Sequence, residues 1–182
     1  MRITSRTVGA VATALALIVT TPAHAGASPG TTAADEPTAA CLEDVKYLYR
    51  AHRGNLAELA AAEAALTESE NRHVRRIAKM LMVDHTKYDR VIVDLAEEHE
   101  VDLPMRPTQK QRADLAAVVA LDGPEFDRAW LELQVAAHKQ TLDFIGRERD
   151  GGCAENVKAA AEMAEAPVQR HLKAVEEVPA PE

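Results

Sequence analysis

The sequence predicts an all-α protein made of four long amphipathic helices and one short helix. Three observations support this fold class. Apolar residues recur at alternating spacings of three and four along four segments, which is the pattern of a helix with one buried face. The breaks between these segments are rich in Gly, Pro and helix-capping residues. No segment alternates apolar and polar residues with the period of two that is typical of a half-buried strand.

The first 25 of the 182 residues predict a secretory signal peptide. Arg2 and Arg6 precede an apolar run from Val8 to Val19, and Ala23-His24-Ala25 is a cleavage site of the A-x-A type. The apolar run is too short for a transmembrane helix, and no later segment is apolar enough to span a bilayer. We therefore expect a secreted or extracytoplasmic protein of the cell envelope, cleaved near Ala25.

The remaining chain divides into three parts. Residues 26–37 are rich in small residues and proline, which predicts a flexible N-terminal segment. Residues 38–177 carry the helical patterns and amount to about one domain. Residues 178–182 form a polar tail that contains proline.

Two uninterrupted stripes predict the first two long helices, with a polar break at residues 67–71 between them. The first stripe comprises Leu42, Val45, Tyr49, His52, Leu56, Leu59, Glu63 and Leu66. The second comprises Val74, Ile77, Leu81, Asp84, Tyr88, Val91 and Leu95, with His85 at its border. We expect these two helices to form an antiparallel hairpin.

The second half of the chain predicts a short helix and two further long ones. Thr108 and Gln111 form a capping box that starts a short helix, and Asp122-Gly123-Pro124 ends it. The third long helix is expected from Glu125 to Arg149, before the break at Gly151 and Gly152. The stripe of the fourth comprises Val157, Ala161, Ala164, Val168, His171 and Val175.

Cys41 and Cys153 are the two cysteines of the chain, and in an exported protein an even number favours a disulfide. Their bond would place the starts of the first and last long helices together. In a simple up-down bundle those starts are about 38 Å apart, whereas disulfide-linked Cα atoms lie within about 7 Å. The disulfide therefore predicts a four-helix bundle with one long helical crossover between helices 2 and 3, the arrangement of ferritin-like bundles. The alternative is an up-down bundle with two free thiols.

Three histidines fall on predicted apolar faces at one level of such a bundle. Counted from the cysteine end, His52, His85 and His138 form one layer with Asp84 close by, and His171 lies about 9 Å higher. Neutral imidazoles on facing helices are good ligands for zinc, copper or iron. We therefore expect His52, His85 and His138 as candidate metal ligands, with Asp84 and His171 as weaker candidates. The alternative is a structural network of hydrogen-bonded core histidines.

Several short matches together resemble the DUF4142 family, which comprises exported bacterial proteins with a ferritin-like helical bundle, often described as outer membrane proteins. The matching residues are Glu58-Leu59-Ala60, Ala78, Met82-Val83-Asp84-His85, Gly123, Phe126-Asp127, Gln134 to His138, Pro167 and His171-Leu172. The resemblance covers about Cys41 to Val175 and implies the bundle fold and an exported location, but no defined activity. It also implies recurring histidines at His85, His138 and His171, whereas His52 has no clear counterpart.

Charge and motifs exclude several classes of function. Without Arg2 and Arg6 the chain has 19 basic and 29 acidic residues. The resulting net charge of −10 argues against nucleic acid as a partner. The carboxylate that precedes each ligating histidine by three residues in di-iron bundles is replaced by Met82, Val135 and Val168. No phosphate loop or zinc-protease motif occurs, so an enzyme is disfavoured.

We expect an exported, soluble helical bundle without enzymatic activity that holds a transition metal (zinc, copper or iron) through buried histidines. The alternatives are a structural or protein-interaction module of the cell envelope that binds no metal, and a metal-dependent enzyme. The sequence identifies no protein partner and leaves oligomerisation open.

Overall fold

The computed structural model describes residues 39–179, and these contain five helices and no strand. The helices are α1 (Leu42–Glu68), α2 (Arg72–Glu98), α3 (Gln109–Val119), α4 (Gly123–Gly151) and α5 (Glu155–Glu176). The predicted signal peptide and the segment 26–37 lie outside the described residues, as does most of the tail 178–182. No helix of the described chain is long and apolar enough to cross a membrane.

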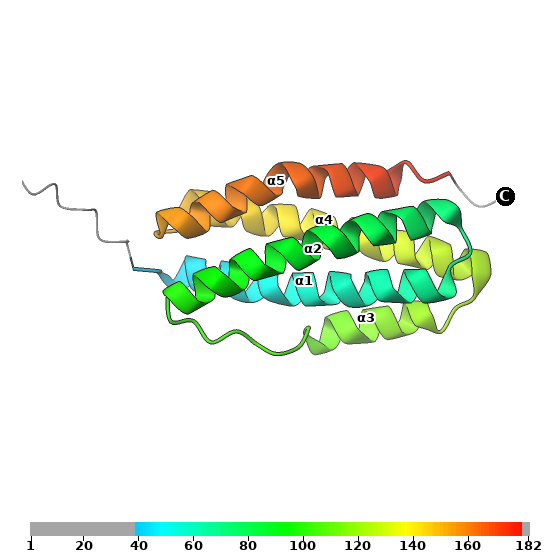
Figure 1. The fold of residues 1–182 in the computed structure, drawn as a ribbon, viewed down its shortest axis with the longest axis horizontal. Helices are drawn as coiled ribbons and strands as arrows, with labels where there is room; N and C mark the ends of the chain where they lie inside the picture. Colours follow the sequence, from blue (N-terminus) through cyan, green and yellow to red (C-terminus); the bar gives the residue numbers. More distant parts are fainter. Residues whose placement is uncertain (1–38, 180–182) are drawn as a thin grey trace, which may run out of the picture. The chain divides into compact units, whose positions relative to one another are not determined.

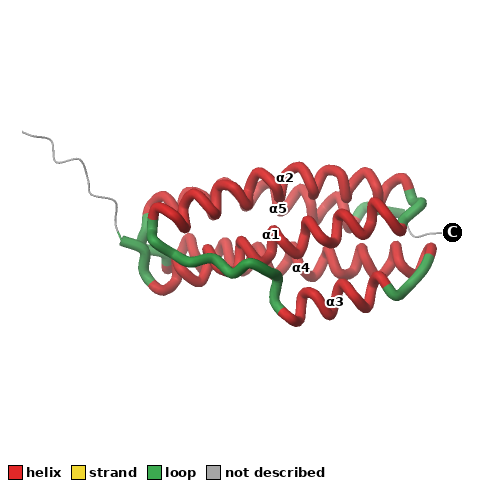
Figure 2. The backbone as a smooth tube through the Cα atoms, turned by 60° about the horizontal axis from the view of Figure 1, so that its bottom comes forward, coloured by secondary structure: helices red, strands yellow, loops and turns green. Residues whose placement is uncertain are grey.

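The long helices form a ferritin-like four-helix bundle with one long crossover, as predicted. Around the bundle the neighbours are α1 with α2, α2 with α5, α5 with α4, and α4 with α1. After α2 the chain turns back along the bundle in an extended segment and α3, which packs against α4 and α1 (Figures 1 and 2). The crossover returns the chain to the end of the bundle where α2 begins. As a result α4 runs parallel to α2, and α5 runs parallel to α1 (Figure 1).

The disulfide Cys41–Cys153 joins the starts of α1 and α5, and its Cα atoms are 5.7 Å apart. Asp44 reinforces this junction from within. Its buried carboxylate accepts hydrogen bonds from the backbone N–H groups of Cys41 at 2.6 Å, Cys153 at 3.0 Å and Ala154 at 3.1 Å. One carboxylate thus satisfies free N–H groups at the beginnings of both helices, where the helix dipole also favours negative charge.

A second carboxyl lies beside Asp44 in this junction. Burial and, to a smaller extent, the neighbouring Asp44 carboxylate together raise the pKa of Glu148 to about 8. Burial opposes ionisation of Asp44 too, but the Glu148 carboxyl and the three backbone N–H groups hold its pKa below the usual value. At neutral pH the pair therefore carries one charge, on Asp44, with the proton on Glu148.

Two apolar clusters occupy the two ends of the bundle. Near the disulfide the cluster contains Tyr47, Leu48, Ile92, Leu95, Ile145 and Val157. At the other end it contains Val74, Ile77, Leu81, Phe126, Trp130 and Val175. The residues between these clusters along each long helix include the buried polar side chains Asn55, Glu58, His85, Gln134, His138 and His171. The core is therefore two apolar blocks separated by a polar layer.

The predicted face of α1 is wrong by about one residue. Leu42 is exposed, and Val45, Tyr49, Leu56 and Leu59 are only partly buried. The buried residues of α1 are Asp44, Tyr47, Leu48, His52, Asn55, Glu58, Ala61, Ala62 and Ala65. The core face of this helix is built largely from alanine and polar side chains, which give a weak hydrophobic pattern.

Candidate metal centre

Three histidines from three helices meet in the polar layer. His85 lies on α2, His138 on α4 and His171 on α5, and their exposed fractions are 6%, 2% and 1%. One ring nitrogen from each lies within 4.8 Å of the other two. The ring centres are 5.9 Å apart for His85 and His138, and 5.5 Å apart for each of the other two pairs. We call this set the histidine triad.

Each triad histidine has one nitrogen bound to an acceptor outside the triad. His85 Nδ1 donates to Asn55 Oδ1 at 2.9 Å, and His138 Nδ1 donates to the backbone carbonyl of Gln134 at 2.9 Å. His171 Nε2 donates to the Asp84 carboxylate at 3.0 Å. These oxygens can only accept, so each ring's single proton lies on its outer nitrogen.

The orientation of the Asn55 amide supports the tautomer of His85. Asn55 Nδ2 donates to the Asp89 carboxylate at 3.4 Å, which directs the amide oxygen toward His85. The remaining triad nitrogens are Nε2 of His85, Nε2 of His138 and Nδ1 of His171, and none has a hydrogen-bond partner among the described residues. Each of these three buried nitrogens therefore has a lone pair that accepts no hydrogen bond from the described residues.

The triad is neutral at neutral pH. Burial and, to a smaller extent, the two neighbouring histidines together lower the pKa of His85 to about 3. Burial likewise lowers the pKa of His138 to about 4. It also lowers the pKa of His171, although the Asp84 carboxylate partly offsets the effect. Neutral imidazole with a free lone pair is the form that binds metal ions.

The spacing of the rings fits a single ion. A metal lies about 2.0–2.1 Å from a coordinating imidazole nitrogen, and so about 3.2 Å from the ring centre. Three such rings around one ion have centres about 5.2 Å apart in tetrahedral geometry and about 5.5 Å apart in trigonal geometry. The observed separations of 5.5 to 5.9 Å require only a small contraction.

A carboxyl lies on the outer side of the triad. Glu58 Oε1 is 3.9 Å from His138 Nδ1, and the Glu58 side chain is almost completely buried. Burial raises its pKa to about 8, although the nearby Gln134 amide lowers it slightly. Glu58 is therefore largely protonated at neutral pH, and it faces the nitrogen of His138 that already carries a proton.

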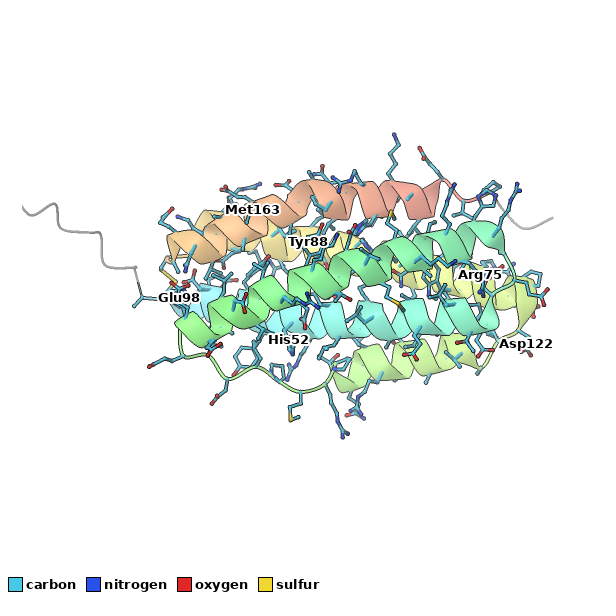
Figure 3. The ribbon with its side chains drawn as sticks, in the orientation of Figure 1. His52, Arg75, Tyr88, Glu98, Asp122 and Met163 are labelled. Atoms are coloured by element: carbon cyan, nitrogen blue, oxygen red, sulfur yellow. A yellow bond between two sulfur atoms is a disulfide. The ribbon has the colours of Figure 1, made fainter. Side chains whose placement is uncertain are left out.

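His52 lies apart from the triad, contrary to the predicted layer. Its Nδ1 is 2.8 Å from Asp89 Oδ1 (Figure 3 labels His52 on α1). His171, expected about 9 Å higher, occupies the place that was predicted for His52. Asp84, predicted as a weaker candidate ligand, lies outside the triad and accepts a hydrogen bond from His171 Nε2.

The observed helix ends and side-chain directions explain why His171, rather than His52, lies with His85 and His138. His85 and His138 each lie 13 residues before the last residues of α2 and α4, whereas His52 lies only 10 residues after the first residue of α1. Helical side chains tilt toward the N-terminus of their own helix. Because α5 starts at the disulfide end, the His171 side chain tilts toward that end. The side chains of His85 and His138, on helices that run the other way, tilt toward the opposite end and so meet it. The His52 side chain, on α1, also tilts toward the disulfide end, which takes it away from His85 and His138.

Asn55 and Glu58 are polar residues of this layer that the metal-site prediction missed. Asn55 lies 13 residues after the start of α1, at the level of His85 and His138. Asn55 and Glu58 are three residues apart, so they share one helical face with His52. That polar spacing, rather than the leucine pattern, marks the core face of α1.

The fold and the triad define a ferritin-like helical bundle whose centre has three convergent histidines in place of a di-iron carboxylate set. The sequence profile of the DUF4142 family, a domain of unknown function, matches residues 27–178, and the chain belongs to this family.

A similar solved structure is the crystal structure of a DUF305 fragment from Deinococcus radiodurans, with 16% sequence identity and a TM-score of 0.68. The match covers 76% of this chain and 95% of that one, and at this identity it shows the fold alone. None of the curated proteins matches the sequence.

Proposed function

We propose that this protein binds one transition-metal ion, such as zinc, copper or iron, through His85, His138 and His171. The observation that carries the proposal is that one ring nitrogen from each of three buried histidines lies within 4.8 Å of the other two, while each ring also has one nitrogen without a hydrogen-bond partner among the described residues. Burying polar atoms without partners is unfavourable. A cation at the centre would satisfy all three nitrogens together.

The hydrogen bonds around the triad also support a metal site. Ligating histidines commonly donate their other N–H to a carboxylate, a backbone carbonyl or a comparable acceptor, which fixes the tautomer and the ring orientation. Here Asp84, the carbonyl of Gln134 and Asn55 take these three positions. Three protein ligands leave a further coordination position open, which suits water or a small ligand in a zinc site.

We further propose that the protein acts outside the cytoplasm. The disulfide is compatible with an oxidising compartment, and the signal-peptide pattern of residues 1–25 favours export. The role that fits best is metal binding without catalysis, because the carboxylate that contacts the triad, Asp84, accepts the outer N–H of His171 and so serves to orient that ring.

Metal titration of the protein tests this proposal. We expect the protein, stripped with a chelator and then titrated with Zn²⁺, Cu²⁺ or Fe²⁺, to retain one ion per chain of at least one of these metals. At a free concentration one hundred times the Kd, the ion should raise the unfolding free energy by about 2.7 kcal/mol. Replacing any one of His85, His138 or His171 by Ala should weaken binding by about 100-fold or more.

His52→Ala is the matched control, since His52 is also buried and paired with a carboxylate but lies outside the triad. This variant should bind metal like the unchanged protein. Equal metal uptake by all four variants would refute the proposal, as would the absence of any retained metal. In either case a purely structural polar layer would be the better account.

A further inference from the structure

A cavity of about 630 Å³ lies beside the triad and reaches His85. Its lining residues come from all five helices. Small residues leave this space open where the helices face one another, including Gly54, Ala57, Ala137, Ala160 and Ala164. The volume is within the range of about 300–1,000 Å³ that is typical of small-molecule sites.

Two polar side chains in the cavity wall are almost completely buried and lack partners. Gln134 has an exposed fraction of 0%, and neither of its amide atoms has a hydrogen-bond partner in the described part of the chain. Glu58 has an exposed fraction of 7%, and its Oε2 is likewise unpartnered. Arg53, also in the wall, has a buried Nε–H without a partner. Buried polar groups are normally paired, so these groups indicate a missing partner.

Two of these unpartnered groups are donors. Arg53 offers a charged N–H and Gln134 an amide N–H. Asp114, on the α3 wall, is already paired with Lys110 at 2.7 Å. The charged N–H of Arg53 and the amide N–H of Gln134 favour an anionic head group with acceptor oxygens, such as a carboxylate.

The rest of the wall is apolar. It includes Leu133 and Phe144 on α4, Val91 and Ile92 on α2, and Met163 and Val168 on α5. Met163 is 68% exposed and Val91 is 41% exposed, so the α2–α5 side of the cavity has an apolar rim (Figure 3 labels Met163 on α5 and Tyr88 on α2). An apolar body that extends from the donors toward this rim would cover side chains that otherwise face water.

We propose that this cavity binds a monocarboxylate with an apolar body, such as a medium-chain fatty acid, whose head group contacts Arg53 and Gln134. The apolar body then occupies the space between α2 and α5. This inference does not depend on the metal site, because neither Arg53 nor Gln134 belongs to the triad.

Calorimetric titration of the metal-free protein with decanoate, below its aggregation concentration, tests the proposal. We expect one decanoate per chain, and binding at least about tenfold tighter than that of decan-1-ol, which has the same body without the charge. Gln134→Leu should weaken decanoate binding by about tenfold.

A matched pair of glycine variants tests the location. Gly54 lines the cavity and Gly146 does not, and an added Cβ meets no atom within 4 Å at either helical position. Both Gly54→Leu and Gly146→Leu should therefore fold, and each should gain helix propensity. Gly54→Leu should weaken decanoate binding by about tenfold or more, whereas Gly146→Leu should leave it unchanged.

The proposal is overturned if decanoate does not bind, if decan-1-ol binds as tightly, or if the two glycine variants behave alike. Because every measurement uses metal-free protein, none of these results bears on metal binding by the triad.

Discussion

Removal of the Cys41–Cys153 disulfide is expected to lower the free energy of unfolding by about 4–5 kcal/mol. The bond closes a loop with a sequence separation of 112 residues, so it strongly restricts the unfolded chain. The Cys41→Ala/Cys153→Ala double variant avoids free thiols and should show the loss as a lower urea midpoint. The unchanged protein unfolded in a reductant should give the same midpoint as the variant.

Asp44 is expected to keep the starts of α1 and α5 together after the disulfide has been removed. Asp44 holds the starts of α1 and α5 together without the sulfur atoms, through N–H groups of Cys41, Cys153 and Ala154. The double variant should therefore still fold, with the same helix content. A loss below about 1 kcal/mol would contradict the expectation and would mean that the unfolded chain is already restricted at this junction.

Acidification of the metal-free protein is expected to remove a comparable amount of stability through the triad. The pKa values of His85 and His138 fall from 6.5 to about 3 and about 4 on folding, so between these limits the unfolded chain binds protons that the folded chain does not. Stability is then lost as the pH falls below about 6.5. Each such proton changes the unfolding free energy by up to about 1.4 kcal/mol per pH unit.

Comparison with the His85→Gln/His138→Gln double variant isolates this effect. Between pH 6 and pH 4.5 the unfolding free energy of the unchanged protein should fall more steeply, by up to about 2.7 kcal/mol per pH unit. Glu58 and Glu148 have pKa values raised to about 8 and oppose the loss, but both proteins contain them. Equal slopes in urea unfolding across this range would show that the two histidines are protonated in the folded state.

The topology could be predicted from the sequence because two cysteines constrain it. A bond between the starts of two helices excludes the simple up-down bundle, and the crossover is long enough to span the molecule. The face of α1 could not be predicted from hydrophobicity, since alanines and the polar residues Asn55 and Glu58 line the core there. The leucines of α1 suggested a neighbouring face.

The exchange of His52 for His171 shows where the prediction of the site was incomplete. The count of residues along each helix placed His85 and His138 correctly in one layer but took no account of side-chain direction. The tilt of side chains toward the N-terminus of each helix brings His171 into the layer and takes His52 out of it. The resemblance to the DUF4142 family had implied the same three histidines on independent grounds.

The proposed metal site would give a ferritin-like bundle a metal chemistry different from that of di-iron proteins. The positions three residues before His85, His138 and His171 are Met82, Val135 and Val168, so carboxylates do not bridge a second ion there. Three neutral imidazoles leave the full charge of a bound ion uncompensated by ligands. The nearest carboxylate to the triad is Asp84, which acts through the outer nitrogen of His171. A single ion with an exchangeable position is the expected result.

Anomalous diffraction from crystals grown with zinc tests the central claim most directly. At the zinc edge we predict one strong peak in the polar layer, about 2.0–2.1 Å from Nε2 of His85, Nε2 of His138 and Nδ1 of His171. The hydrogen bonds to Asn55, the Gln134 carbonyl and Asp84 should remain in place. A fully loaded crystal whose only zinc peaks lie elsewhere would contradict the claim, as would a peak bound through the outer nitrogens of the triad.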